Sequence, residues 1–334
     1  MRAVVYDAVG AVPEIREIEP PACPSDGAVI AVRATGVCRS DWHAWRGHDP
    51  VPLPHVPGHE FAGVIEQLGP AVTGFAVGDR VTAPFVNGCG RCAYCLSGSA
   101  QICPDQTQPG FTHPGSFAER VVVRAATTNL VRLPDSIDFV SAAALGCRFA
   151  TAFRALTGHG PLAGDAVVAV YGCGGVGLSA IMIATALGLR VLAVDPSPAA
   201  NALAASLGAV IVHEIDGEAD IAIDAYGSAE TAFASVRALR PGGRHVQVGL
   251  MLGADSRAPL PWDLVVAREL QVVGSHGMAA ADYPPMLELV ASGRLSPRRL
   301  VGSEIPLEAL GVALTTMDSP IPGHAGIVVG VHEK

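Results

Sequence analysis

Four cysteines crowd one glycine-rich stretch of the sequence, and their spacing is typical of metal ligands. Cys89, Cys92, Cys95 and Cys103 follow one another at intervals of three, three and eight residues. Structural zinc sites take four thiolates in a tetrahedron, and short Cys-x-x-Cys spacings supply them without a folded core. The stretch therefore predicts a closed structural zinc site, and a pair of disulfides is the alternative.

The compartment decides between these two states of the thiols. The chain begins with Met1-Arg2-Ala3, and the sequence after it does not read as a charged leader with an apolar core and a cleavage site. This predicts a cytoplasmic protein. In a reducing compartment the cysteines stay free to bind metal.

A second set of candidate ligands is dispersed along the chain: Cys38, His59 and Cys147. Three protein ligands leave one position of a tetrahedral zinc open, as in catalytic sites. Spacing alone does not single these residues out, because isolated histidines and buried cysteines are common structural residues.

The neighbours of the dispersed ligands add chemistry. Ser40 and His43 follow Cys38 after two and five residues, and each can pass a proton. Asp41 and Glu60 are candidate carboxylates behind the metal, where they would orient His59 or adjust the metal's charge. These neighbours favour a catalytic metal over scattered structural residues.

A glycine-rich loop predicts a dinucleotide site. The run Gly172-Cys173-Gly174-Gly175-Val176-Gly177 fits G-x-G-x-x-G, and it lies between an expected strand and an expected helix. There the backbone amides at the helix N-terminus can approach a pyrophosphate. Asp195, at the end of the next expected strand, can accept hydrogen bonds from ribose hydroxyls. Its charge, and the absence of Lys or Arg from 196–207, predict NAD rather than NADP.

The elements that would position these residues fall into two patterns. Up to about residue 125, valine-rich runs at 29–34, 63–68 and 117–123 are separated by Pro- and Gly-rich turns, which predicts β structure. After Cys147 strands alternate with alanine-rich helices, which predicts a doubly wound parallel sheet. The expected strands are 166–171, 190–195, 220–226 and 244–250, the expected helices are 176–188, 198–207 and 229–239, and a turn is expected at 241–243. From about 278 a helix at 284–292 and a strand at 326–331 are expected to return to the first domain.

Composition sets the class of protein. The chain has 334 residues, of which half are hydrophobic, and 31 acidic against 22 basic residues give a formal charge of -9. That charge disfavours nucleic acid and anionic membranes as partners. The apolar runs at 166–171 and 178–189 are too short or too interrupted to cross a bilayer, so no membrane is expected.

In its motifs the chain resembles the zinc-containing alcohol dehydrogenases of the medium-chain dehydrogenase/reductase superfamily. The resemblance covers nearly the full length. It rests on the segments 36–43 (GVCRSDWH) and 57–63 (PGHEFAG), the four-cysteine run, Cys147 and the glycine loop, all in family order. It implies a GroES-like β domain over 1–149 with two zinc sites, a Rossmann NAD domain over 150–277, and a return of 278–334 to the first domain.

The resemblance also implies roles for single residues. Cys38, His59 and Cys147 would hold the catalytic zinc, with Glu60 behind it. Zinc would act as a Lewis acid on a small primary or secondary alcohol while hydride passes to NAD. The hydroxyl proton would leave through Ser40, the nicotinamide ribose hydroxyl and His43. Three further positions matched by the family are Arg39 for the pyrophosphate and the pocket aromatics Trp45 and Phe85.

The chain departs from the family at one position and leaves alternatives open. The family usually has a basic residue near 323–326 that helps to neutralise the pyrophosphate, and here only His324 offers a weak substitute. Polyol and threonine dehydrogenases share the plan, but Cys147 favours the alcohol branch, since that position is commonly a carboxylate in theirs. A zinc-containing NAD-binding sensor without turnover is a second alternative. Family members assemble as dimers or tetramers, and a tetramer is favoured by analogy alone.

Overall fold

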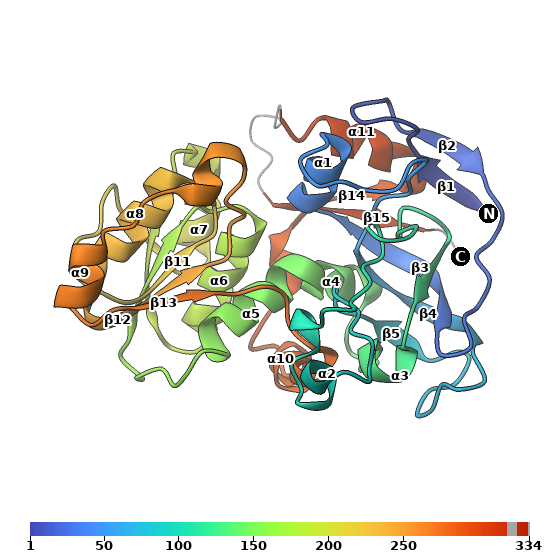
Figure 1. Ribbon diagram of the computed structural model, residues 1–334, viewed down its shortest axis with the longest axis horizontal. Coiled ribbons are helices and arrows are strands. Elements are labelled where there is room, and N and C mark those ends of the chain that lie inside the picture. The colour runs from blue at the N-terminus through green and yellow to red at the C-terminus, as the bar shows by residue number, and fades with distance from the viewer. Residues whose placement is uncertain (319–325, 333–334) are drawn as a thin grey trace. The chain divides into compact units, whose positions relative to one another are not determined.

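The computed structural model describes residues 1–318 and 326–332, and the chain divides into two compact units (Figure 1). The first unit comprises Met1–Ala150 with the described parts of 277–318 and 327–332. The second comprises Thr151–His276. His324, the substitute considered for the missing basic residue, lies outside the described residues.

The first unit is built on a seven-stranded sheet. The order is β14-β15-β3-β4-β5-β7 with β6 also paired to β3, and all pairs are antiparallel except β14 with β15. Its strands are β3 (Ala28–Val37), β4 (Glu60–Leu68), β5 (Arg80–Thr82), β6 (Arg120–Val123), β7 (Val131–Arg132), β14 (Val301–Pro306) and β15 (Ile327–Val331), and a separate antiparallel pair is formed by β1 (Arg2–Val5) and β2 (Glu14–Glu17). The expected return of the last strand to the first unit is therefore observed.

The register of β3 against β4 brings distant residues together. Gly36, near the end of β3, pairs with Glu60, the first residue of β4. Cys38 follows β3 directly and His59 precedes β4 directly. Because antiparallel neighbours place the end of one strand beside the start of the next, the two candidate ligands are adjacent in space.

Short helices complete the first unit. They are α1 (Arg39–Trp45), α2 (Ala93–Leu96), α3 (Ala126–Asn129), α4 (Phe139–Ala144), α10 (Tyr283–Ala291) and α11 (Leu310–Thr315), with 3₁₀ turns η1 (Ala100–Ile102), η4 (Ala280–Asp282), η5 (Pro297–Leu300) and η6 (Leu307–Ala309). A π-helical stretch, η2 (Leu145–Phe149), follows α4 and carries Cys147. Such π turns often occur at functional sites.

Two apolar clusters fix the sheet of the first unit. One packs Phe61, Ile65 and Val121 between the strands, and the other packs Val37, Trp45 and Phe117 against β1 and α11. The two clusters therefore pack the strands β3 and β4, whose ends adjoin the candidate ligands.

The second unit has a six-stranded, all-parallel sheet in the order β10-β9-β8-β11-β12-β13. Its strands are β8 (Val167–Tyr171), β9 (Arg190–Val194), β10 (Val210–Ile211), β11 (Ala219–Asp224), β12 (Leu239–Gln247) and β13 (Gln271–Gly274), and its helices are α5 (Ala150–Thr157, which leads in from the first unit), α6 (Gly175–Ala186), α7 (Pro198–Ser206), α8 (Ala229–Arg237), α9 (Trp262–Ala267) and the turn η3 (Gly253–Arg257). Numbered within the unit, the order is 3-2-1-4-5-6, the doubly wound dinucleotide-binding arrangement. The expected α/β fold class is confirmed.

Two local expectations need correction. The turn expected at Pro241–Gly243 lies inside β12 as an unpaired bulge, not between two elements: pairing with β11 passes from Leu239 to Arg244, pairing with β13 begins at Arg244, and Gly242 has a φ of 76°. The strand expected at 117–123 begins only at Arg120.

The helical segments over Phe139–Thr157, which are kinked at Gly146, together have the length and apolar composition of a membrane span. However, 78% of this stretch is buried inside the protein. Because it also carries Cys147, we treat it as a core helix of this fold.

Candidate metal and cofactor sites

The dispersed ligands meet at one point in the first unit. One donor atom each of Cys38, His59, Glu60 and Cys147 lies within 4.8 Å of the other three. They come from the end of β3, the start of β4 and the π-helical stretch, so three separate segments meet there. Two thiols, an imidazole and a carboxylate are a donor set that suits zinc.

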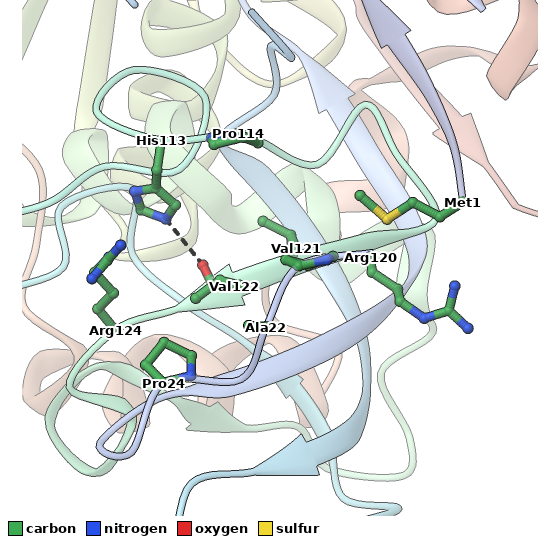
Figure 2. Close-up of a pocket in the computed structure, with 10 residues that line it drawn as sticks. Met1, Ala22, Pro24, His113, Pro114, Arg120, Val121, Val122 and Arg124 are labelled. Carbon is green, nitrogen blue, oxygen red and sulfur yellow. Dashed lines mark hydrogen bonds between the residues drawn. The ribbon is translucent and has the colours of Figure 1, made fainter. Parts of the chain in front are cut away.

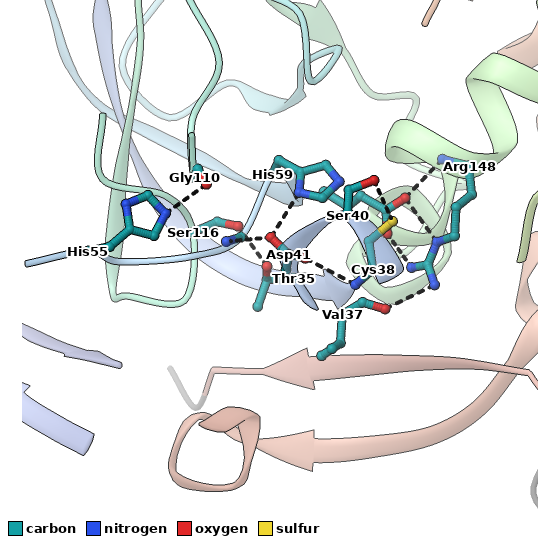
Figure 3. A network of polar contacts seen from close by, with 12 residues as sticks. Thr35, Val37, Cys38, Ser40, Asp41, His55, His59, Gly110, Ser116 and Arg148 are labelled. Atoms are coloured by element: carbon teal, nitrogen blue, oxygen red, sulfur yellow. Dashed lines mark hydrogen bonds and ion pairs between the residues drawn. The ribbon is translucent and has the colours of Figure 1, made fainter. Parts of the chain in front are cut away.

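Asp41 orients the histidine of this group (Figure 3). Its Oδ1 accepts hydrogen bonds from His59 Nδ1 and from the Gly58 amide, both at 2.9 Å, and its Oδ2 accepts one from the Cys38 amide at 3.0 Å. The Asp41 carboxylate therefore holds the backbone at Cys38 and just before His59, and it also holds the His59 ring.

The other ring nitrogen of His59 is left without a partner. His59 is fully buried, and its Nε2 atom has no hydrogen-bond partner among the described residues. A buried polar atom normally finds a partner. With Nδ1 taken by Asp41, Nε2 is the ring atom left to bind a metal, and His59 lies beside the Cys38 and Cys147 thiols. The residues present therefore fit a zinc ion.

Arg148, which was not predicted from the sequence, lies behind the group. The Arg148 amide and its Nε donate to Glu60 Oε1, each at 3.0 Å, Nη2 pairs with Oε2, and Nη1 donates to the Val37 carbonyl at 3.0 Å. Glu60 is fully buried and Arg148 nearly so. A buried bidentate pair of this kind is rigid and costly to break.

Gly36 provides the space for this ion pair. A Cβ at that position would collide with Glu60 Oε2 and would lie 2.9 Å from Arg148 Nη2. Only glycine at this position of β3 therefore leaves space for the Glu60 and Arg148 side chains.

The protonation of the Cys38 thiol depends on that of the Cys147 thiol. A hydrogen bond from Cys147, together with the charge of Arg148, lowers the pKa of Cys38 well below its usual value despite burial. The same hydrogen bond and burial raise the pKa of Cys147. Without metal the pair thus holds one proton, which a zinc ion would displace.

The two candidate proton carriers lie on helix α1, which begins directly after Cys38. Ser40 Oγ is 3.8 Å from Cys38 Sγ, so the hydroxyl lies at the candidate metal group. His43 lies one turn further along, and its ring touches that of His48, with the two Nδ1 atoms 3.0 Å apart. Burial and the neighbouring His48 and Arg39 lower the pKa of His43, which keeps it neutral at pH 7.

The four clustered cysteines also converge. Their sulfurs all lie within 4.8 Å of one another, with Cys92 Sγ 3.5 Å from Cys95 Sγ and 3.6 Å from Cys103 Sγ. A disulfide would need about 2.05 Å, whereas sulfurs on a tetrahedral zinc stand about 3.8 Å apart, given Zn–S bonds of about 2.3 Å. All eight cysteines of the chain are free. This geometry favours metal over the disulfide alternative.

Backbone amides prepare this cysteine loop for thiolates. Hydrogen bonds from the amides of Arg91 and Cys92 lower the pKa of Cys89 to about 6. The Cys89 amide points at Cys103 Sγ at 3.4 Å, and the Cys95 amide at Cys92 Sγ at 3.5 Å. Burial raises the pKa of Cys95 to about 12, so not every thiol is ready to ionise without the metal.

The glycine loop joins β8 to α6 in the second unit, as expected. A Cβ on Gly177 would run into the carbonyl of Gly172, so helix and strand can meet this closely only with glycine there. Asp195 follows β9, and its carboxylate accepts hydrogen bonds from the Cys173 amide at 2.6 Å and the Ser197 amide at 2.7 Å. The remaining members of the loop, Gly174, Gly175 and Val176, form the start of α6.

Arg39 is half exposed in the first unit. Its guanidinium donates to the Met317 carbonyl at 3.0 Å, lies 3.5 Å from Asp318 Oδ1 and covers the Trp42 ring. These contacts position a cation on the surface beside the candidate site, and an anionic ligand would compete with them.

The two predicted pocket aromatics differ in their surroundings. The Phe85 ring lies 6.0 Å from the His59 ring, edge to face, and Phe111, not selected from the sequence, lies 5.2 Å from it. Trp45 is instead packed in the core beside Val37, and its indole nitrogen donates to the Ala11 carbonyl at 2.7 Å.

A separate cavity of about 230 Å³ lies near the N-terminus of the first unit (Figure 2). It is lined mainly by apolar side chains together with His113, Arg120 and Arg124, and none of the predicted site residues lines it. His113 Nε2 is bonded to the Val122 carbonyl, and Arg120 is paired with Glu66.

Three residues that the structure places beside predicted site residues were not predicted from the sequence: Arg148, Phe111 and His48. Arg148 directly follows Cys147, so its position beside a ligand was a usable signal. Phe111 has no comparable signal, because a loop brings it to His59 from 52 residues away.

Comparison with known proteins agrees with this geometry. Residues 24–135 match the family described as "Alcohol dehydrogenase GroES-like domain", and residues 175–292 match "Zinc-binding dehydrogenase". An alcohol dehydrogenase of Geobacillus stearothermophilus is 35% identical over 313 residues, covering 88% of this chain and 90% of the relative. A sorbitol dehydrogenase of Halalkalibacterium halodurans is 33% identical over 319 residues, covering 86% and 91%.

Solved structures give the same result. The alcohol dehydrogenase of Thermus sp. ATN1 superposes with a TM-score of 0.89 at 30% identity, covering 99% of each chain. A cobalt- and zinc-bound alcohol dehydrogenase of Pyrobaculum aerophilum gives 0.87 at 29% identity over 99% of each chain. The chain therefore belongs to the zinc-binding alcohol dehydrogenases of the medium-chain dehydrogenase/reductase superfamily, oxidoreductases that interconvert alcohols and aldehydes or ketones with zinc and NAD.

Proposed function

We propose that this enzyme oxidises small primary or secondary alcohols at a zinc ion held by Cys38, His59 and Cys147. The observation that carries the proposal is the buried, unpartnered Nε2 of His59, beside two thiols and with Nδ1 fixed by Asp41. Three ligands leave a position for the substrate oxygen. When bound, zinc supplies a Lewis acid that lowers the pKa of a hydroxyl beside it.

The residues around this site divide the remaining work. Asp41 holds the His59 ring in the tautomer that offers Nε2, and the Glu60–Arg148 pair holds the charge behind the thiolates. Ser40 takes the hydroxyl proton of the substrate, and His43, which is neutral at pH 7, receives it further out. Each of these side chains can perform its role from the position that it has in the structure.

The cysteine loop, in this proposal, binds a second zinc, giving two per subunit. Cys89, Cys92, Cys95 and Cys103 fill all four positions, so that ion has no room for substrate and stabilises the loop. The sulfur separations of 3.5 and 3.6 Å support this assignment.

The glycine loop and Asp195 bind NAD in the second unit. The amides at the start of α6 face the pyrophosphate and the Asp195 carboxylate takes the ribose hydroxyls, at the cost of its present bonds to the Cys173 and Ser197 amides. Arg39 adds a cation for the pyrophosphate in exchange for its contact with Asp318.

The pocket is apolar on the side of Phe85 and Phe111, whose rings flank His59. Such walls favour small aliphatic or aromatic alcohols over polyols, which would leave hydroxyl groups without partners. The predicted second aromatic, Trp45, would act through the core that supports helix α1. The similarity to a sorbitol dehydrogenase keeps polyols as the second candidate class of substrate.

The test is an alcohol panel with NAD, read at the NADH absorbance band, on protein whose zinc content has been measured. We expect turnover of simple alcohols well above that of sorbitol or threonine. Turnover of polyols alone would mean that polyols, and not small alcohols, are the substrates. No turnover in either direction by zinc-loaded protein would favour the sensor alternative.

We further infer a homo-oligomer in the cytoplasm, with a tetramer favoured over a dimer. The free thiols suit a reducing compartment, and the assembly follows the family resemblance alone. Light scattering of the purified protein would distinguish the two assemblies.

A further inference from the structure

His43 and His48 form a pair of imidazoles at the end of helix α1. Their Nδ1 atoms are 3.0 Å apart. A hydrogen bond between two imidazoles needs a protonated nitrogen on one ring and a lone pair on the other, so the tautomer of each ring sets that of its partner.

The backbone at the C-terminal end of helix α1 brings the two histidines together. Gly47 adopts a positive φ of 76°, which reverses the chain, and the His48 amide then donates to the His43 carbonyl at 2.9 Å. A Cβ on Gly47 would lie 2.8 Å from a methyl of Val9, so a larger residue fits poorly there.

Trp42 holds both rings from one side. Its ring centroid is 5.0 Å from that of His43 and 5.4 Å from that of His48, in both cases nearly edge to face. The two histidine rings are therefore held in place by their backbone hydrogen bond, by their contact with each other and by Trp42.

The charges around the pair favour passing a proton outward. Arg39 and Arg46 lie over the Trp42 ring, and Asp49 follows His48. The Cys38 thiol and Asp49 also act on His43, and Asp318 is the ion-pair partner of Arg39. Burial, then His48 and Arg39, lower the pKa of His43, so a proton that arrives there is poorly retained. His48 is exposed and meets water.

We propose that His48 is the outer proton carrier of this enzyme, taking the substrate proton from His43 and releasing it to solvent. This rests on the role given to His43 under the proposed function. In the resting pair, His43 donates Nδ1–H to Nδ1 of His48, whose proton is on Nε2. A proton arriving at His43 Nε2 moves the Nδ1 proton to His48, and His48 then loses its Nε2 proton to water.

The transfer balances without any other reactant. One proton enters at His43, one leaves at His48, and both rings end neutral in the opposite tautomer. Exchange with water resets them before the next turnover. Aldehyde reduction runs the same steps in reverse, which delivers a proton from solvent.

The test compares His48→Gln with His43→Gln and with His213→Gln, an exposed histidine of the second unit. In dilute buffer at pH 6–7 we expect His48→Gln to slow alcohol oxidation about 10-fold, less than the roughly 100-fold loss expected for His43→Gln. Concentrated phosphate at constant ionic strength should restore the His48 variant, because a buffer base can replace an exposed carrier. His213→Gln should match the unaltered enzyme.

A second readout does not depend on turnover. In an NMR titration of the zinc-loaded protein, the pH midpoint of the His43 ring should change when His48 is replaced by Gln. A His48→Gln enzyme with the unaltered rate and pH profile in dilute buffer, or a slow one that phosphate does not restore, would overturn the proposal. If His43→Gln is slow while His48→Gln is normal, the proposed function stands and only the outer carrier is lost. No NADH formation by the unaltered enzyme would instead remove the proposed function.

Discussion

The two candidate metal sites of the first unit are built in opposite ways. The dispersed site draws its ligands from residue 38 to residue 147, at strand ends and in a π-helical turn, and the Asp41 side chain bonds to the His59 ring and the Cys38 amide. The cysteine loop draws all four from residues 89–103, and backbone amides support its sulfurs.

Burial separates the two sites as well. Cys38, His59 and Glu60 are buried, whereas three of the four loop cysteines are partly exposed. The packed sheet can therefore preserve the dispersed site without metal, but the short loop has little core to hold it. We infer that zinc serves chemistry in the first site and folding in the second.

The largest effect should come from removing a ligand of the dispersed site. Cys147→Ser is expected to lower alcohol turnover by at least about 1,000-fold, since the Lewis acid is lost. NAD affinity, measured by fluorescence titration, should remain nearly intact, because the glycine loop lies in the other unit. Equal losses of turnover and of NAD affinity would contradict this separation.

Removing a ligand of the cysteine loop should act on stability instead. Cys95→Ser is expected to lower the free energy of unfolding by on the order of 5 kcal/mol, because metal-linked folding energy is lost. Thermal melting with zinc analysis measures it, and Cys23→Ser, a thiol outside both clusters, is the matched control. A Cys95→Ser protein that melts as the unaltered one does would refute the structural role.

The contrast also explains what could be predicted from the sequence. The cysteine loop was visible at once, because its ligands are close neighbours in the chain. The dispersed ligands needed the family motifs, since the strand pairing that joins Cys38 to His59 leaves no mark in their spacing. Strand and helix order in the second unit followed from alternation of β-branched and alanine-rich segments.

What could not be predicted depends on tertiary contacts. Arg148 pairs with Glu60 only because β3 and β4 align Gly36 with Glu60 and leave space there. The residues Pro241–Gly243 indicate a turn, yet they form an unpaired bulge within β12, because Leu239 and Arg244 on either side of them both pair with β11. Trp45 was selected as a pocket residue, and local sequence gave no sign that Ala11 would bind its indole nitrogen.

A smaller effect, on stability rather than on turnover, should come from the charge behind the dispersed site. Arg148→Met keeps an unbranched apolar stem but leaves the Glu60 carboxylate buried without a counter-charge, which should cost about 3 kcal/mol in urea unfolding. Arg132→Met, which breaks the more exposed pair with Asp79, is the control and should cost less than about 1 kcal/mol.

Combining Arg148→Met with Glu60→Gln shows whether the cost is electrostatic. If it is, the double variant recovers much of the lost stability, because no buried charge remains. Cobalt absorption adds a second measure: a freed Glu60, already within 4.8 Å of the other ligand atoms, should bind the metal in Arg148→Met and change the d–d bands. Additive losses in the double variant, with an unchanged cobalt spectrum, would mean that Arg148 acts through packing alone and that both sites depend on the fold in the same way.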